Sequence, residues 1–136
     1  MALTGRGLLA PSAEDLAALA EAAWTGFPPW VRRAAGALVI RVEEIADDEL
    51  LDEMDIEDPY ELTGVYEGVA LTDRSVDDPP AGPDVVRLFR RAILEEWIDR
   101  GDVPLDELVA HIVVHELAHH FGWSDERIAE IDPWWE

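Results

Sequence analysis

The chain has 136 residues, a length that fits one domain of ordinary size, and about half of them (49%) are hydrophobic. Its ten basic residues are all arginine and face 31 Asp and Glu, so the formal net charge is -21. This charge argues against general nucleic-acid binding, which needs clustered cations. Because there is no cysteine, the composition excludes disulfide frameworks, thiolate zinc sites and cysteine nucleophiles.

The N-terminal segment carries one arginine and only a short apolar run, so it does not resemble the core of a signal peptide. No apolar stretch approaches the length of a membrane span. We therefore expect a soluble, cytoplasmic protein. Residues 1–11 are predicted to be a flexible tail and residues 12–136 a single domain.

The first half of the chain alternates helical and strand patterns. Apolar residues repeat at helical spacing after Ser12, which is a good helix cap. A β-branched run bounded by Gly36 and acidic residues is typical of a strand. The predicted elements are a helix from Ser12 to Trp24, a helical turn from Trp30 to Ala35, a strand from Ala37 to Val42, an acidic helix from Asp47 to Met54 and a strand from Leu62 to Leu71.

The second half begins after a proline-rich loop that ends at Pro83. Pro104 suits the first turn of a long helix that reaches Phe121, because proline fits helix starts, and Gly122 is expected to end this helix. The predicted elements are a strand from Val85 to Phe89, a helix from Ala92 to Asp99, the long helix from Pro104 to Phe121 and a short helix that Ser124 caps and that ends near Ile131.

All four histidines lie between positions 111 and 120. His115 and His119 are four residues apart on the long predicted helix, so they project about 40° apart from one face and can bind one metal ion. Glu116 lies about 60° from His119, close enough to contact a water on that metal without binding the metal itself. This is the geometry that the H-E-x-x-H pattern encodes.

The residues after the motif extend it. A left-handed turn at Gly122 can bring Asp125 back toward the two histidines, which matches the longer pattern H-E-x-x-H-x-x-G-x-x-(H/D). His115, His119 and Asp125 are therefore the predicted ligands of one zinc ion. Three protein ligands leave a fourth position for water, as in catalytic zinc sites. Glu126 and Glu130 are alternative third ligands.

The two remaining histidines are expected to have other roles. His120 lies about 140° round the helix from His115, so a packing or supporting role is favoured over metal binding. His111 lies one turn before His115 on nearly the same face, where it can line the cleft.

The segment from His115 to Gly122, followed by acidic residues, resembles the small bacterial zincin-like metallopeptidases, or minimal zincins. The resemblance extends to the segments Leu62–Gly68 and Pro83–Arg90. It implies an α+β fold in which a small three- to four-stranded mixed sheet packs on an active-site helix with additional helices. It also implies that His115 and His119 bind zinc, with Glu116 as the catalytic base and Asp125 as third ligand.

The predicted function is that of a zinc-dependent peptidase, in which a metal-activated water attacks a peptide bond and Glu116 acts as general base. The expected partner is a peptide or protein substrate, with no nucleic acid and no membrane. His120, Tyr60 and Tyr66 are candidate donors to the oxyanion. The strand from Val85 to Phe89 is the expected sheet edge along which substrate binds.

Two other functions compete with this prediction. The chain could be a non-catalytic metal-binding module that contacts or regulates a partner, with Trp134 and Trp135 mediating contact. It could also be a metal-dependent endoribonuclease, since one such family uses a similar histidine spacing. That family typically has glycine where this chain has Glu116, and the charge of -21 opposes RNA binding.

Overall fold

A computed structural model describes residues 10–68 and 84–131. The predicted loop before Pro83, the two tryptophans near the C-terminus and most of the predicted N-terminal tail lie outside these ranges. The helices are α2 (Ala13–Gly26), α3 (Pro29–Ala35), α4 (Asp48–Glu53), the 3-10 helix η1 (Pro59–Glu61), α5 (Arg90–Arg100), α6 (Leu105–Phe121) and α7 (Asp125–Ile131). The strands are β1 (Leu38–Glu43), β2 (Gly64–Glu67) and β3 (Asp84–Phe89).

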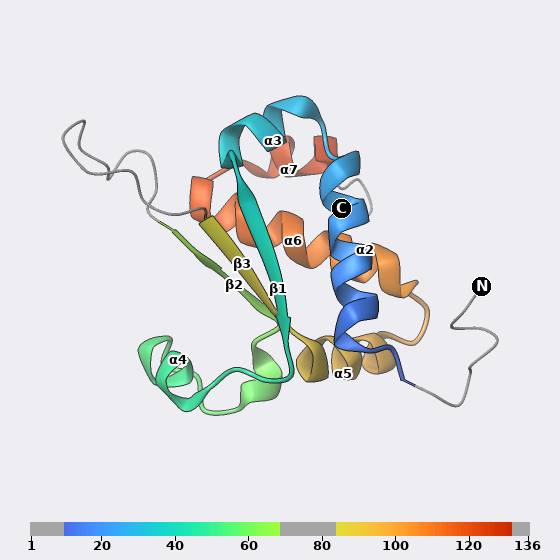
Figure 1. Cartoon of the computed structure of the whole chain (residues 1–136), viewed down its shortest axis with the longest axis vertical. Coiled ribbons are helices and arrows are strands. Elements are labelled where there is room, and N and C mark those ends of the chain that lie inside the picture. Colours follow the sequence, from blue (N-terminus) through green and yellow to red (C-terminus); the bar gives the residue numbers. More distant parts are fainter. Residues whose placement is uncertain (1–9, 69–83, 132–136) are drawn as a thin grey trace.

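The three strands form one mixed sheet in the order β1-β3-β2 (Figure 1). The first strand runs parallel to β3, with Ile40 opposite Val86. The second runs antiparallel to β3, with Tyr66 opposite the same Val86. This arrangement confirms the predicted α+β class with a small mixed sheet. No helix among the described residues is long and apolar enough to cross a membrane.

The middle position of β3 contradicts the prediction that Val85 to Phe89 forms the edge for substrate. Both sides of β3 are occupied, one by β1 and the other by β2. Val86, Leu88 and Phe89 are fully buried, as expected for a central strand. The open edge of the described sheet that faces α6 belongs to β2, which contacts that helix.

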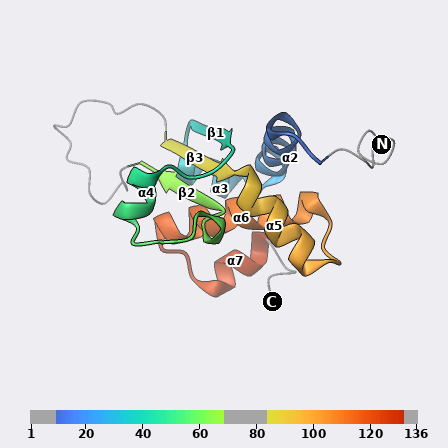
Figure 2. The same cartoon turned by 90° about the horizontal axis from the view of Figure 1, so that it is seen from below.

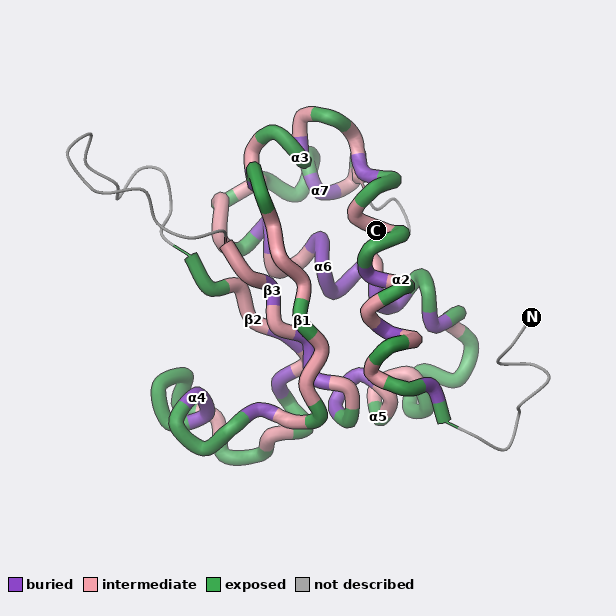
Figure 3. The backbone as a smooth tube through the Cα atoms, viewed as in Figure 1, coloured by how far each residue is buried: buried purple, intermediate pink, exposed green. Residues whose placement is uncertain are grey.

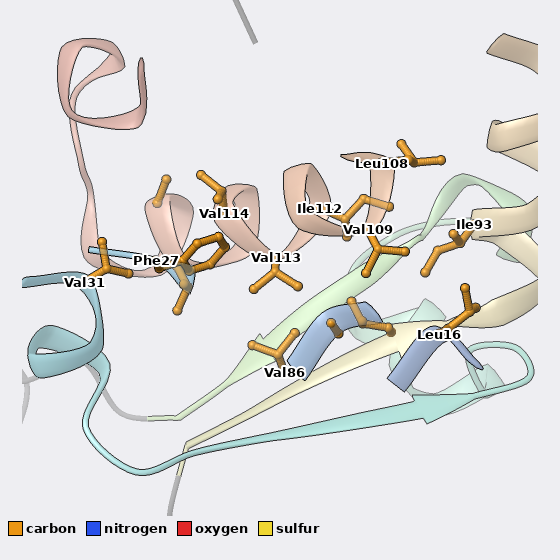
Figure 4. Close-up of a cluster of buried hydrophobic side chains, with 14 of the residues drawn as sticks. Leu16, Phe27, Val31, Val86, Ile93, Leu108, Val109, Ile112, Val113 and Val114 are labelled. Atoms are coloured by element: carbon orange, nitrogen blue, oxygen red, sulfur yellow. The ribbon is translucent and has the colours of Figure 1, made fainter. Parts of the chain in front are cut away.

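The core lies between the sheet and α6. Val109 and Val113 project from α6 toward Val86 of β3 and Leu16 of α2, as Figure 4 shows, and all four are fully buried. Helix α2 contacts both α6 and β1, so it closes the core beside the sheet. Figure 2 shows α6 running below the strands with α7 on its far side, and in Figure 3 α6 is buried over much of its length.

The other face of the sheet carries a charged cluster centred on Arg87 of β3. The guanidinium donates to both carboxylate oxygens of Glu43 on β1, at 2.8 and 3.1 Å, and to Glu67 on β2 at 3.2 Å. Hydrogen bonding to Glu43 raises the pKa of Arg87 above its usual range. One arginine therefore links the central strand to both of its neighbours.

Local sequence accounts for the helix ends. Ser12 accepts a hydrogen bond from the amide of Asp15, whose carboxylate accepts from the amide of Ser12, so α2 begins with a capping box. Asp47 caps α4 by accepting from the amide of Leu50. Helix α5 begins at Arg90, directly after β3, two residues earlier than predicted. The other predicted helices and strands begin within a few residues of their expected bounds, and the predicted end of the second strand at Leu71 lies outside the described residues.

The contact between β2 and α6 generates a prediction about Gly64. A Cβ atom at Gly64 would lie 3.1 Å from Leu88 Cδ2, 3.2 Å from the carbonyl oxygen of Arg87 and 3.4 Å from Ile112 Cγ2. Gly64→Ala should therefore lower the free energy of unfolding by about 1 to 3 kcal/mol, because β2 must shift away from Leu88 and the carbonyl of Arg87 on β3. Urea unfolding measures the change.

Gly26→Ala is the matched control, since a Cβ there meets no atom within 4 Å. It should change the free energy of unfolding by less than about 0.5 kcal/mol. Equal effects of the two substitutions would show that close packing at Gly64 is not needed for stability.

Candidate metal centre

Helix α6 carries the H-E-x-x-H residues in its last two turns, and Gly122 ends it. Gly122 adopts the left-handed conformation, with φ 68° and ψ 35°. The amide of the next residue, Trp123, donates to the carbonyl of Ala118 at 3.0 Å, which closes the last turn. The chain then turns directly into α7, as the sequence predicts.

His115 lines a pocket of about 270 Å³ beside α6, and its Nε2 atom is buried. His111, one turn earlier, is buried as well and packs against it, with ring centroids 4.4 Å apart. Both rings therefore face the same pocket, and the expected cleft-lining place of His111 is confirmed. The complete lining is Thr63, Glu96, Arg100, His111, Ile112, His115 and Glu116.

Glu116 is partly buried in the same pocket and accepts a hydrogen bond from the backbone N–H of Tyr66 on β2. Burial raises the pKa of Glu116 to about 7, because desolvation penalises the charged carboxylate, while the hydrogen bond from Tyr66 opposes this rise. The carboxyl group is thus held at the open edge of the sheet, where it can exchange a proton near neutral pH.

The structure places the other two predicted ligands at the surface. His119 is exposed near the end of α6, and Asp125 is exposed as the first residue of α7. Across residues 10–68 and 84–131, no group of three or more His, Asp and Glu side chains is arranged so that it could hold a metal ion. The ligand set of His115, His119 and Asp125 therefore stays a prediction, and it requires the segment around Asp125 to approach α6.

His120 packs against β2. Its ring stacks on Tyr66 with centroids 3.9 Å apart, so its expected packing role is confirmed. The phenolic hydroxyl of Tyr66 donates to the carboxylate of Asp84 at 2.6 Å, which fixes the ring of Tyr66. The other proposed oxyanion donor, Tyr60, lies in a separate groove against α5 and does not line the pocket of Glu116.

Aromatic side chains hold the turn between α6 and α7. Trp123 stacks on Phe121 at 5.5 Å and meets Trp30 of α3 edge to face at 5.0 Å. The guanidinium of Arg127 on α7 lies 4.1 Å from the centroid of the Trp30 ring. Residues on both sides of Asp125 thus contact one tryptophan, so α3 helps to place the start of α7.

Sequence reasoning missed three polar residues of the pocket, Thr63, Glu96 and Arg100. The Nε of Arg100 donates to Glu96 at 2.9 Å, a pair that the spacing of four residues on a helix can predict. Its position beside the histidines follows from the packing of α5 against α6, which no local pattern encodes.

A sequence profile described as zincin-like metallopeptidase matches residues 35–135. The chain belongs to this family. The matched region of the zincin-like chain contains the whole sheet, α6 and the candidate centre, which confirms the resemblance inferred from the motif. Among curated proteins, none matches the chain closely enough to count as a relative.

The pKa of Glu116 generates a prediction for the metal-free protein. Because its pKa is about 7 in the fold and 4.5 in an exposed chain, the folded state binds the proton more tightly. The neutral carboxyl group of Glu116 therefore stabilises the fold relative to the charged one. This stabilisation is complete below pH 4.5 and is lost as the pH rises to 7. Glu116→Gln should therefore raise the free energy of unfolding by about 2 to 3 kcal/mol at pH 8 and leave it nearly unchanged at pH 4.

Urea unfolding in the presence of a chelator at both pH values measures this difference. Glu107→Gln, an exposed position in the first turn of the same helix, is the control and should show no such pH dependence. Equal stability of wild type and Glu116→Gln at pH 8 would show that Glu116 is not desolvated.

Proposed function

We propose that this zincin-like chain is a zinc-dependent peptidase that uses Glu116 as its general base and one zinc ion bound by His115, His119 and Asp125. The observation that carries the proposal is the position of Glu116. Its carboxyl group lies beside His115 in a pocket at the open sheet edge, with a pKa of about 7. A general base acts best when its pKa lies near the working pH.

The donor chemistry on α6 suits zinc. Two imidazoles one helical turn apart are common zinc ligands, and the buried Nε2 of His115 is an imidazole nitrogen of the kind that zinc binds. Asp125 supplies the carboxylate that would complete three protein ligands. Zinc, when bound, acts as a Lewis acid toward the scissile carbonyl and lowers the pKa of a bound water.

The chain's own residues orient the proton transfer. The amide of Tyr66 fixes the carboxyl group of Glu116 against β2. From this position Glu116 accepts a proton from the attacking water and returns it to the leaving amine. Because the pocket walls include Ile112 and His111, they keep part of the bulk water away from the carboxyl group.

The open edge of β2 is the proposed place for substrate, in place of the buried β3. The amide of Phe89 donates to the carbonyl of Thr63, so the backbone of Gly64 and Tyr66 faces away from β3. Because the amide of Tyr66 already donates to Glu116, an added strand would pair through other outward-facing backbone groups of this edge. An extended peptide can add to such an edge as a further strand. A peptide bound at this edge would lie next to Glu116.

A non-catalytic metal-binding module is the second candidate function. The exposed positions of His119 and Asp125 do not separate the two candidates, because a metal site of either kind needs its ligands assembled. The burial of a carboxyl group with a near-neutral pKa beside His115 favours the peptidase, since a module that only binds metal has no use for a general base.

The first test of the function compares cleavage of a mixed peptide library by wild type, Glu116→Gln and Glu107→Gln in the presence of zinc. Removal of a general base should lower kcat/KM by about 100-fold to 10,000-fold in Glu116→Gln, with zinc content unchanged. Glu107→Gln, at an exposed position of α6, should cleave as wild type does. Zinc-loaded wild type that cleaves no more than Glu116→Gln would refute the peptidase and favour the binding module.

A second test concerns the ligands. Removal of an outer-shell partner of a zinc ligand weakens metal binding by about 10- to 100-fold. We expect a larger loss of zinc affinity in each of three variants that remove a ligand itself: His115→Ala, His119→Ala and Asp125→Ala. Competition with a chromogenic chelator measures the dissociation constant. Glu130 is the matched carboxylate on α7, and Glu130→Ala should bind zinc as wild type does. If Glu130→Ala binds zinc weakly and Asp125→Ala binds it normally, Glu130 is the third ligand.

A further inference from the structure

A second concave surface, which the proposed catalysis does not use, lies on α5. We call it the α5 groove; it is shallow and open to solvent, with a volume of about 480 Å³. Ile98 is 73% exposed and Tyr60 is 40% exposed at this surface. Among the described residues, Met54 is the only other large hydrophobic residue with an exposed side chain. The complete lining of the groove is Tyr60, Arg91, Leu94, Glu95 and Ile98.

The α5 groove faces away from the catalytic pocket. Ile98 lies about 200° round the helix axis from Arg100, which lines the pocket of Glu116. Leu94 and Ile98 are one turn apart on the groove side of α5. An occupant of the groove would therefore contact η1 and the outer face of α5 and leave Glu116 uncovered.

The charges around the groove select its occupant. Exposed Glu57, Asp58 and Glu61 lie at and beside η1, which packs on α5, and Glu95 and Asp99 are exposed on α5 itself. The cation in the lining, Arg91, already lies 3.6 Å from Glu44.

This acidic border, on a chain of net charge -21, repels an anionic membrane. A second copy docked symmetrically would bring two acidic borders together, which is unfavourable.

We propose that the α5 groove binds a basic amphipathic helix of a partner protein. Apolar side chains one turn apart on that helix fit against Leu94, Ile98 and Tyr60, and flanking lysines or arginines meet the acidic border. The lining from Arg91 to Ile98 spans eight residues of α5, a rise of about 10 Å, which matches two turns of a docked helix. This interaction goes beyond the proposed peptidase and does not depend on it.

The test uses two synthetic helical peptides with the same flanking lysines. One carries two leucines a helical turn apart, and in the other serines replace both leucines. Fluorescence anisotropy measures their binding to the full-length chain in wild type, Ile98→Glu and Met54→Glu. Both substitutions replace an exposed hydrophobic residue with a carboxylate, but Met54 does not line the groove.

We expect wild type to bind the leucine peptide about tenfold or more tightly than the serine peptide. Ile98→Glu should lose this preference, although its added negative charge strengthens any purely electrostatic attraction to lysines. Met54→Glu should keep the preference. Circular dichroism should show that both variants are folded, as expected for exposed positions.

Three outcomes would overturn the proposal. Equal binding of the two peptides to wild type would show that charge alone attracts them. An unchanged preference for the leucine peptide in Ile98→Glu would place the binding surface elsewhere. A wild-type dimer that Ile98→Glu converts to a monomer in sedimentation experiments would identify the groove as a contact between copies of this chain.

Discussion

Helix α6 packs on β2 at Gly64, where a Cβ atom would lie 3.4 Å from Ile112 Cγ2 of α6 and 3.1 Å from Leu88 Cδ2 of β3. This contact sets the next one. Tyr66 follows Gly64 by two residues, which is about 6.6 Å along the strand. Glu116 follows Ile112 by one helical turn, which is about 6 Å along the helix. The amide of Tyr66 therefore meets the carboxyl group of Glu116.

The same close contact decides the electrostatics of the site. A carboxyl group pressed against a strand loses water, and the single amide of Tyr66 does not replace it, so the pKa of Glu116 remains raised at about 7. Packing that orients Glu116 thus also sets its affinity for a proton. His120 and Phe121, which contact the Tyr66 ring, keep the last turn of α6 in register with this strand.

Local patterns predicted the strands and most of the helices, including the helix that carries the H-E-x-x-H motif, because caps, turn residues and the 3.6-residue period act over short distances. They did not predict the strand order, because Val85 to Phe89 has the same alternation at an edge or in the middle of a sheet. The decisive partners of Arg87 are Glu43 and Glu67, which lie 44 and 20 residues away in sequence. The pocket residue Arg100 was missed for the same reason, since only tertiary packing brings α5 beside His115.

Helix α5 has two surfaces with different chemistry, and the net charge of -21 acts on both. On one surface the Glu96–Arg100 pair lies in the pocket of Glu116, and on the other Leu94 and Ile98 lie beside Glu95. Long-range attraction brings any basic ligand toward either surface and weakens as salt increases. Apolar contact at Ile98 does not weaken in this way. Charge therefore governs the association rate of a basic chain, whereas the side chains of each surface determine how slowly a bound chain dissociates.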